Sequence, residues 1–511
     1  MSTSTRVIKN TFFLYAKMGI TMFFSLWTTR LILNSLGASD FGIFNIVGGA
    51  IAMLGFLNVA MASATQRFMS FNEGAGNREK LKTVFNVSLV MHILLAFIVG
   101  IVLTGAGFVF FNGVLNIPEE RTTAAIVVYG SLVLSTMVTV ATVPYDAVIN
   151  AHENMKYYAV VGILESLLKL AVAFACVYTL SDKLIVYGML MAFIPFVTLG
   201  IMCVYCHRHY SECIISPRQY YSKSDMKEMA SFAGWNLMGV SASMIGNYGQ
   251  LIVINFFFGV LMNAAMGIVN QVQGQLLVLT NNMQKALNPV IVKKKGAQQH
   301  QEMLDWSFTG CKFAYLLFAC VAIPVAVESK TILTLWLKNV PEWTELFLQL
   351  QLIRTGIECM VGNIAATLNA TGKIKGLNIV NAFFFLFSLI VLCAMFACGL
   401  PAYSLFILMI VIVGLQSVNI IRLAHKMCNL SVKGYLTNVL LPLLTATVIV
   451  ISLGYAATII VPAGIFRMIA NCLSMMLILC MVSYKIVLNK VEKDTILNLL
   501  SKLCKGKIQE K

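Results

Sequence analysis

The sequence predicts an all-α integral membrane protein. Hydrophobic residues make up 59% of the 511-residue chain and charged residues only 11%, whereas a soluble domain carries about 25% charged residues. Apolar runs of about 18 residues or more recur along the whole length, and each is long enough to cross the hydrocarbon core of a bilayer as a helix. Because no soluble core needs so much apolar sequence, soluble fold classes are excluded.

Fourteen spans are predicted from these runs. The first run, about 11–33, is too long for the apolar region of a cleavable signal peptide, and no small-residue cleavage site follows it. It is therefore counted as a span. The predicted spans are about 10–33, 41–65, 83–111, 122–149, 158–180, 184–206, 231–257, 261–287, 306–328, 344–369, 377–398, 402–423, 435–460 and 465–487.

Positive charge gathers on one side of the predicted bundle. An even number of spans places both termini on the same side, and that side carries 27 Lys and Arg residues against 5 on the other. The positive-inside rule then predicts a multi-pass protein with both termini in the cytoplasm. The net charge of +16 reflects this asymmetry and contact with anionic lipid head groups, so we expect no nucleic acid partner. The loops on the other side are all short, which leaves no room for an external domain.

Motifs for metal, haem or nucleotide chemistry are misplaced or incomplete. Residues 203–207 read C-x-x-C-H, a pattern typical of c-type haem attachment and, with nearby His209 and Cys213, of zinc binding. They lie at the predicted cytoplasmic end of the sixth span, where haem attachment of this kind does not occur. Residues 371–373 lack the upstream glycine and the final hydroxyl residue of a P-loop. We therefore expect no cofactor, no metal site and no enzymatic activity.

The chain repeats itself at a nearly constant offset. Asn150-Ala and Asn369-Ala are 219 positions apart, as are Lys156 and Lys375. Two copies of six spans insert with the same orientation because six is even, and such repeats enclose a cleft at the middle of the membrane, as in transporters. The predicted domains are an N-terminal lobe (1–215), a C-terminal lobe (222–425), spans thirteen and fourteen (435–487) and a basic cytoplasmic tail (488–511).

Three stretches resemble polysaccharide flippases of the MOP superfamily. They are the first-loop sequence RLILNSLGASDFGIF (30–44), TQRF (65–68) and LWLKNVP (335–341). The resemblance implies a V-shaped pair of lobes that works by alternating access, as in Wzx-type exporters for O-antigen or capsule synthesis. It implies a substrate that is an oligosaccharide linked to undecaprenyl diphosphate, moved from the cytoplasmic to the periplasmic leaflet of the bacterial inner membrane. Membrane lipids and other membrane proteins of polysaccharide assembly are the expected partners, and a monomer is expected.

Two other functions remain open at this stage. A MATE-like, cation-coupled multidrug exporter belongs to the same superfamily, but such proteins generally have twelve spans. A membrane glycosyltransferase or polysaccharide polymerase would need a long external loop, which this sequence lacks. The count of spans and the three stretches therefore favour the flippase.

Five basic residues fall inside predicted spans, where a charge at mid-membrane costs about 2.5–3.5 kcal/mol on insertion scales. A flippase needs cations in its cleft to hold a diphosphate, and this makes the five residues candidates for that site. The candidates are Lys17, Arg30, Lys169, Lys312 and Arg354. Structural roles are open as well, since Lys17 and Lys312 are close enough to span ends to snorkel. Arg30 is close enough in sequence to Asp40 to pair with it.

Two of these cations have an acid one helical turn away. Glu165 precedes Lys169 by four residues, the favourable order for an ion pair within one helix, whereas Arg354 precedes Glu358 in the less favourable order. Self-neutralisation of Glu165 and Lys169 is an open alternative to a role in the cleft. Neither pair recurs at the repeat position in the other lobe, which favours a role in one working site. Glu165, Glu358 and Asp146 are also candidates for coupling to protons.

Neutral polar residues recur at helical spacing in spans seven and eight. Such stripes suit sugar hydroxyl groups, although they also serve as hydrogen-bonding contacts between membrane helices. The candidates for the lining of the cleft are Asn236, Ser243, Asn247, Gln250, Asn270, Gln273, Asn281 and Gln284.

Overall fold

The computed structural model describes residues 3–52, 55–114, 117–337, 340–462 and 464–494. Every regular element in this part of the chain is a helix, and ten helices are long and apolar enough to cross a membrane by length and composition. The predicted all-α membrane class is confirmed. Of the predicted tail, residues 495–511 lie outside the described residues.

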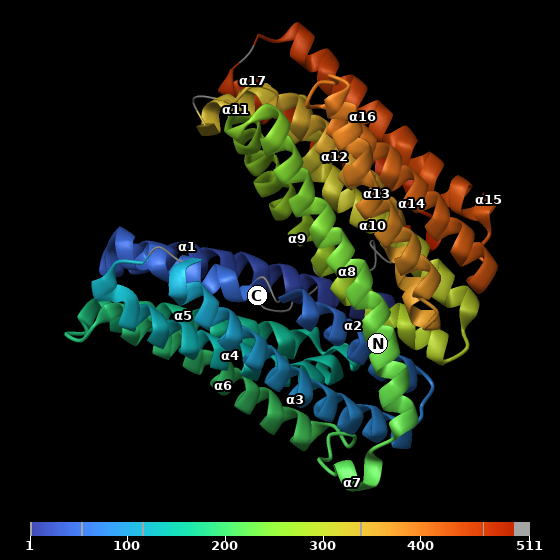
Figure 1. The fold of residues 1–511 in the computed structure, drawn as a ribbon. Coiled ribbons are helices and arrows are strands. Elements are labelled where there is room, and N and C mark those ends of the chain that lie inside the picture. The colour runs from blue at the N-terminus through green and yellow to red at the C-terminus, as the bar shows by residue number, and fades with distance from the viewer. Residues whose placement is uncertain (1–2, 53–54, 115–116, 338–339, 463, 495–511) are drawn as a thin grey trace, which may run out of the picture. The chain divides into compact units, whose positions relative to one another are not determined.

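The helices follow one another with short connections (Figure 1). Those of the first half are α1 (Thr3–Ala52), α2 (Gly55–Gly74), α3 (Arg78–Val109), α4 (Glu119–Ala151), α5 (Met155–Tyr178), α6 (Lys183–His209), α7 (Pro217–Tyr220) and α8 (Lys223–Phe258). Those of the second half are α9 (Val260–Gly296), α10 (His300–Val327), α11 (Ser329–Leu337), α12 (Thr344–Thr371), α13 (Lys375–Ala397), α14 (Ser404–Cys428), α15 (Val432–Tyr435), α16 (Leu441–Ile460) and α17 (Ile465–Val482). The spans predicted at 10–33, 41–65, 261–287 and 344–369 lie on α1, α1–α2, α9 and α12, outside the set of ten.

Two compact units divide the chain, Lys9–Leu237 and Met238–Lys511, the second together with Met1–Ile8. We call them the N-terminal and C-terminal units. Within the N-terminal unit α2, α3 and α4 pack on one another, α4 packs on α6, and α5 packs on α6. Within the C-terminal unit α9, α10 and α12 pack on one another, α12 packs on α14, and α13 packs on α14. The same scheme of contacts occurs in each unit.

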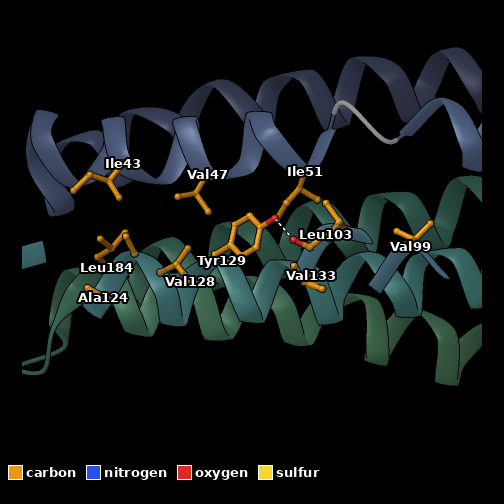
Figure 2. Packing of buried hydrophobic residues seen from close by; sticks show 11 residues of the cluster. Ile43, Val47, Ile51, Val99, Leu103, Ala124, Val128, Tyr129, Val133 and Leu184 are labelled. Carbon is orange, nitrogen blue, oxygen red and sulfur yellow. Dashed lines mark hydrogen bonds between the residues drawn. The ribbon is translucent and has the colours of Figure 1, made fainter. Parts of the chain in front are cut away.

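Buried aliphatic and aromatic side chains hold the N-terminal unit together (Figure 2). One buried cluster contains Ile43 and Val47 of α1, Leu103 of α3 and Val128 of α4. The hydroxyl of buried Tyr129 donates to the carbonyl oxygen of Leu103 at 2.6 Å. A membrane interior offers no water, so without this carbonyl oxygen the Tyr129 hydroxyl would be buried without a hydrogen bond. The other contacts in the cluster stabilise the unit through close packing.

A single glycine joins predicted spans one and two, and another joins predicted spans seven and eight. Gly37 interrupts α1 with φ 79° and ψ 167°, and Gly259, between α8 and α9, has φ 78° and ψ −171°. This backbone region is essentially restricted to glycine. The matching angles, 222 positions apart in sequence, give the two halves the same backbone junction.

Replacing either junction glycine should destabilise its unit. We expect Gly37→Ala and Gly259→Ala each to lower the free energy of unfolding by about 1–3 kcal/mol, because alanine is strained in this region. Nothing lies within 4 Å of the position a Cβ would take at either glycine, so the effect would come from the backbone alone. Thermal unfolding of the purified variants in detergent measures it. Gly42→Ala is the control, since Gly42 is helical with equal space around it, and an equal loss in this variant would contradict the role of the backbone.

Candidate functional site

Lys169 and Glu165 form an ion pair on α5, with 2.6 Å between Nζ and Oε1. Both side chains remain about 40% exposed within the protein, at 42% and 41%. The pairing that the sequence left open is present, and both side chains remain partly exposed within the protein.

Lys17 of α1 reaches the same face of α5. Its Nζ lies 4.1 Å from the ring centroid of Tyr158, and its side chain passes directly over Gly162. Tyr158, Gly162, Glu165 and Lys169 are spaced i, i+4, i+7 and i+11, which puts them on one face of the helix. The structure therefore gathers two cations and one acid on this face.

Arg354 and Glu358 are paired on α12 in the C-terminal unit. Arg354 Nε donates to Glu358 Oε1 at 3.2 Å. The guanidinium is largely buried, with 9% of the side chain exposed, while Glu358 is 37% exposed. Beside them Gln273 Nε2 of α9 donates to Thr355 Oγ1 at 3.2 Å. This second charged site is more enclosed than the one on α5.

Lys312 is enclosed by the chain itself. Its Nζ lies 3.0 and 3.3 Å from the two carboxylate oxygens of Glu492, and Thr309 Oγ1 donates to Glu492 Oε1 at 2.9 Å. The side chains of Lys312 and Glu492 are only 3% and 6% exposed. Of the five predicted cations, Lys312 is therefore the one with a buried internal counter-ion.

Arg30 and Asp146 are not drawn into either charged site. Arg30 is exposed, and the pairing with Asp40 that the sequence left open does not occur, because Asp40 is bound by Arg121 instead. Asp146 on α4 is partly buried, and its Oδ1 has no hydrogen-bond partner among the described residues. Its role in coupling stays a prediction.

The predicted polar stripes divide between contacts and exposed positions. Asn236 Nδ2 donates to the carbonyl oxygen of Ala60 at 3.4 Å, within the N-terminal unit. In the C-terminal unit Gln250 Nε2 contacts Met409 Sδ at 3.3 Å, and Gln284 packs against Gly362. These residues connect helices, whereas the exposed residues are Asn247, Asn270 and Asn281. Ser243 is partly buried and accepts a 3.5 Å hydrogen bond from Asn247 Nδ2.

Two charge clusters at helix ends were missed by the sequence analysis. Arg121 at the start of α4 binds both Asp40 of α1 and Asp182 at the start of α6. Burial alone would raise the pKa of Asp182, but hydrogen bonds from Arg121 and from the backbone of α6 lower it below its ordinary value. The cluster joins α1, just after its break at Gly37, to the starts of α4 and α6. Its members are too far apart in sequence for spacing to reveal them.

The second missed cluster fixes the last helices to α10. Arg467 of α17 lies 2.8 Å from Glu328, which follows α10, and Asn471 donates to the same carboxylate at 2.8 Å. The Glu328 side chain has no exposed surface. Farther along α10 the Tyr315 hydroxyl meets Thr447 of α16 at 2.6 Å. Helices α16 and α17 are therefore fixed to α10 by polar contacts as well as packing.

Comparison with known proteins decides the family. A model of the family described as "Polysaccharide biosynthesis protein" matches residues 7–294, more than half of the chain. The chain belongs to this family. The predicted resemblance to polysaccharide flippases of the MOP superfamily is thereby confirmed.

One curated relative matches a short stretch of this polysaccharide biosynthesis family member. It is the uncharacterized membrane protein EpsK of Bacillus subtilis (strain 168), 29% identical over 100 residues. That alignment covers 20% of this chain and 20% of the relative, so the chain spans about a fifth of the length of the curated relative it matches.

Solved structures of MATE and other MOP superfamily transporters share the fold. An outward-facing multidrug resistance MATE family transporter has a TM-score of 0.68 at 13% identity, covering 84% of this chain and 96% of its own. A MOP superfamily transporter from Pyrococcus furiosus Vc1 (DSM3638), described with a binding pocket of reverse polarity, has a TM-score of 0.67 at 13% identity and covers 84% and 96%. At this identity the likeness shows the fold alone.

Proposed function

We propose that this flippase moves an oligosaccharide linked to undecaprenyl diphosphate across the bacterial inner membrane by alternating access. The observation that carries the proposal is the Lys169–Glu165 pair, whose two charges are about 40% exposed on a membrane-spanning helix. An accessible ammonium at this depth costs free energy unless it meets water or an anion. A diphosphate is an anion that a polysaccharide flippase would carry.

Arg354 is the proposed contact in the C-terminal unit. A guanidinium binds phosphate oxygens through a planar fork of N–H donors, two at a time. Only Nε of Arg354 donates to Glu358 in the structure, which leaves the outer nitrogen atoms for a substrate. The proposal assigns Glu358 to the orientation of this fork.

Transport in liposomes tests the proposal. Wild-type protein and the Lys169→Ala and Arg354→Ala variants are reconstituted with a fluorescent undecaprenyl-diphosphate saccharide, and movement between leaflets is followed by quenching of the accessible label. We expect each variant to flip at least tenfold more slowly, equivalent to about 1.4 kcal/mol of lost interaction. Lys433→Ala, an exposed lysine in α15, is the control and should keep the wild-type rate.

Two results would overturn the proposal. Wild-type flipping by both variants would remove the assignment of the two cations. A wild-type protein that moves no lipid-linked saccharide but exports cationic drugs would favour the MATE-like alternative.

The membrane orientation, with both termini in the cytoplasm, is part of the proposal. It is tested by protease access to the termini in sealed vesicles.

A further inference from the structure

The end of the Lys17 side chain packs on α5 at Gly162, where only a glycine leaves room for it. We call this position, formed by Gly162 and Tyr158, the seat of Lys17. A Cβ built on Gly162 would lie 2.1 Å from Lys17 Cε and 2.6 Å from its Nζ. Heavy atoms that are not bonded do not approach so closely, so any side chain at position 162 would displace the end of the lysine. The displaced atoms are the flexible tip of a side chain, and the helix backbones need not move.

Tyr158 holds the ammonium from the other side of the seat. The 4.1 Å distance from Lys17 Nζ to the ring centroid is within the range of a cation–π contact, which is stronger where water is excluded. Tyr158 lies one turn before Gly162 on the same face of α5. The ring and the missing side chain therefore fix where the Lys17 ammonium lies.

The seat places two cations on either side of one acid. From Gly162, Glu165 is about 4.5 Å farther along the helix axis and Lys169 about 10.5 Å farther, at 1.5 Å per residue. Glu165 binds Lys169 and leaves Lys17 to the ring of Tyr158. Both lysines have long, flexible side chains and can converge on an anion with more than one charged oxygen.

We propose that Gly162 and Tyr158 are positioning residues that hold Lys17 beside Glu165 and Lys169, so that both ammonium groups bind the diphosphate of the substrate together. The inference rests on the proposed function and adds a second cation, from α1, to the site on α5. Glu165 is the internal counter-ion, which the diphosphate displaces from Lys169.

Substitution of Gly162 separates this role from a structural one. In the liposome assay with the full-length protein, we expect Gly162→Ala and Lys17→Ala each to raise the half-saturating concentration of the labelled lipid at least tenfold. The Gly162→Ala/Lys17→Ala double variant should be no worse than Lys17→Ala, because the alanine acts only through Lys17. Tyr158→Phe should be close to wild type since it keeps the ring, whereas Tyr158→Leu should weaken binding.

Gly200→Ala in α6 is the matched control, because Gly200 is also in a membrane-spanning helix and nothing lies within 4 Å of its would-be Cβ. It should keep the wild-type half-saturating concentration. All variants should unfold at the wild-type temperature in detergent. A wild-type half-saturating concentration in Gly162→Ala, or additive effects in the double variant, would overturn the assignment.

A second readout does not depend on transport. Labelling of Lys17 with an amine-reactive reagent, read by mass spectrometry, should be several-fold faster in Gly162→Ala than in wild type, because the ammonium leaves its seat. Equal labelling rates would refute the seat even if flipping is normal. Faster labelling in a protein that flips no lipid-linked saccharide would refute the proposed function, and with it diphosphate binding, while leaving the seat in place.

Discussion

Glu492→Ala should destabilise the C-terminal unit by about 3–5 kcal/mol, because it leaves the Lys312 ammonium buried without a counter-ion. Three groups hold the Glu492 carboxylate: the Lys312 ammonium, the Thr309 hydroxyl and the backbone N–H of Asn489. With the lysine side chain only 3% exposed, water cannot easily replace the carboxylate. Unfolding of the purified protein in a titration with denaturing detergent measures the loss.

The double variant Lys312→Met/Glu492→Met distinguishes an unpaired charge from lost packing. Replacing both members of a buried ion pair with apolar residues is often neutral or stabilising, so we expect the double variant to recover most of the loss. Asp494→Ala, which removes an exposed acid two residues after Glu492, is the control and should stay within about 0.5 kcal/mol of wild type. A double variant as unstable as Glu492→Ala would show that the carboxylate acts through packing.

The class of fold and the local ion pairs were predictable from the sequence for the same physical reason. Apolar runs report directly on burial in lipid, and charges four residues apart on one helix must lie close together. Glu165–Lys169 and Arg354–Glu358, the two pairs with this spacing that the sequence analysis singled out, are both present. Both depend on contacts within one helix.

Ion pairs between distant helices were beyond prediction. Lys312 and Glu492 are 180 positions apart, and Arg467 and Glu328 are 139 apart. No periodicity connects them, since only the packing of α10, α16 and α17 brings them together. One feature near Glu492 was visible in the sequence, because Asn489 and Glu492 have the spacing of a capping box. In the structure each side chain accepts a hydrogen bond from the other residue's backbone N–H group.

The position of Lys17 against α5 could not be predicted from the sequence either. The sequence allowed Lys17 to snorkel or to face the cleft, and neither role involved α5. A glycine in an apolar span can serve many purposes, so nothing in the sequence alone indicated Gly162 as the position that Lys17 covers. The distinction needed the geometry of two helices far apart in sequence.

Arg467→Ala should cost about 3 kcal/mol and more than Glu328→Gln, because the two members of this pair differ in burial. The Glu328 side chain is fully buried, whereas 13% of the Arg467 side chain is exposed. Removing the arginine leaves a carboxylate with only Asn471 and Thr331 as side-chain donors, and a buried charge left unpaired is strongly unfavourable. The Glu328→Gln variant keeps an amide for those partners, and its arginine keeps the carbonyl oxygens of Thr458 and Val461 as acceptors. Lys330→Ala, an exposed neighbour, should be neutral in the same detergent titration.

The double variant Glu492→Ala/Arg467→Ala tests how α16 and α17 are held to α10. Lys312 and Glu328 are 16 residues apart, or about 24 Å along the chain near α10, and changes at such a distance normally add within about 0.3–0.5 kcal/mol. Additive losses in Glu492→Ala/Arg467→Ala would mean that the Arg467 pair fixes the start of α17 and the Glu492 pair separately fixes the chain that follows α17. A combined loss smaller than the sum would mean that breaking either pair already releases α16 and α17 from α10 as one cooperative unit. Because Tyr315, Thr447 and the packing between the two ends remain intact in every variant, we expect additivity.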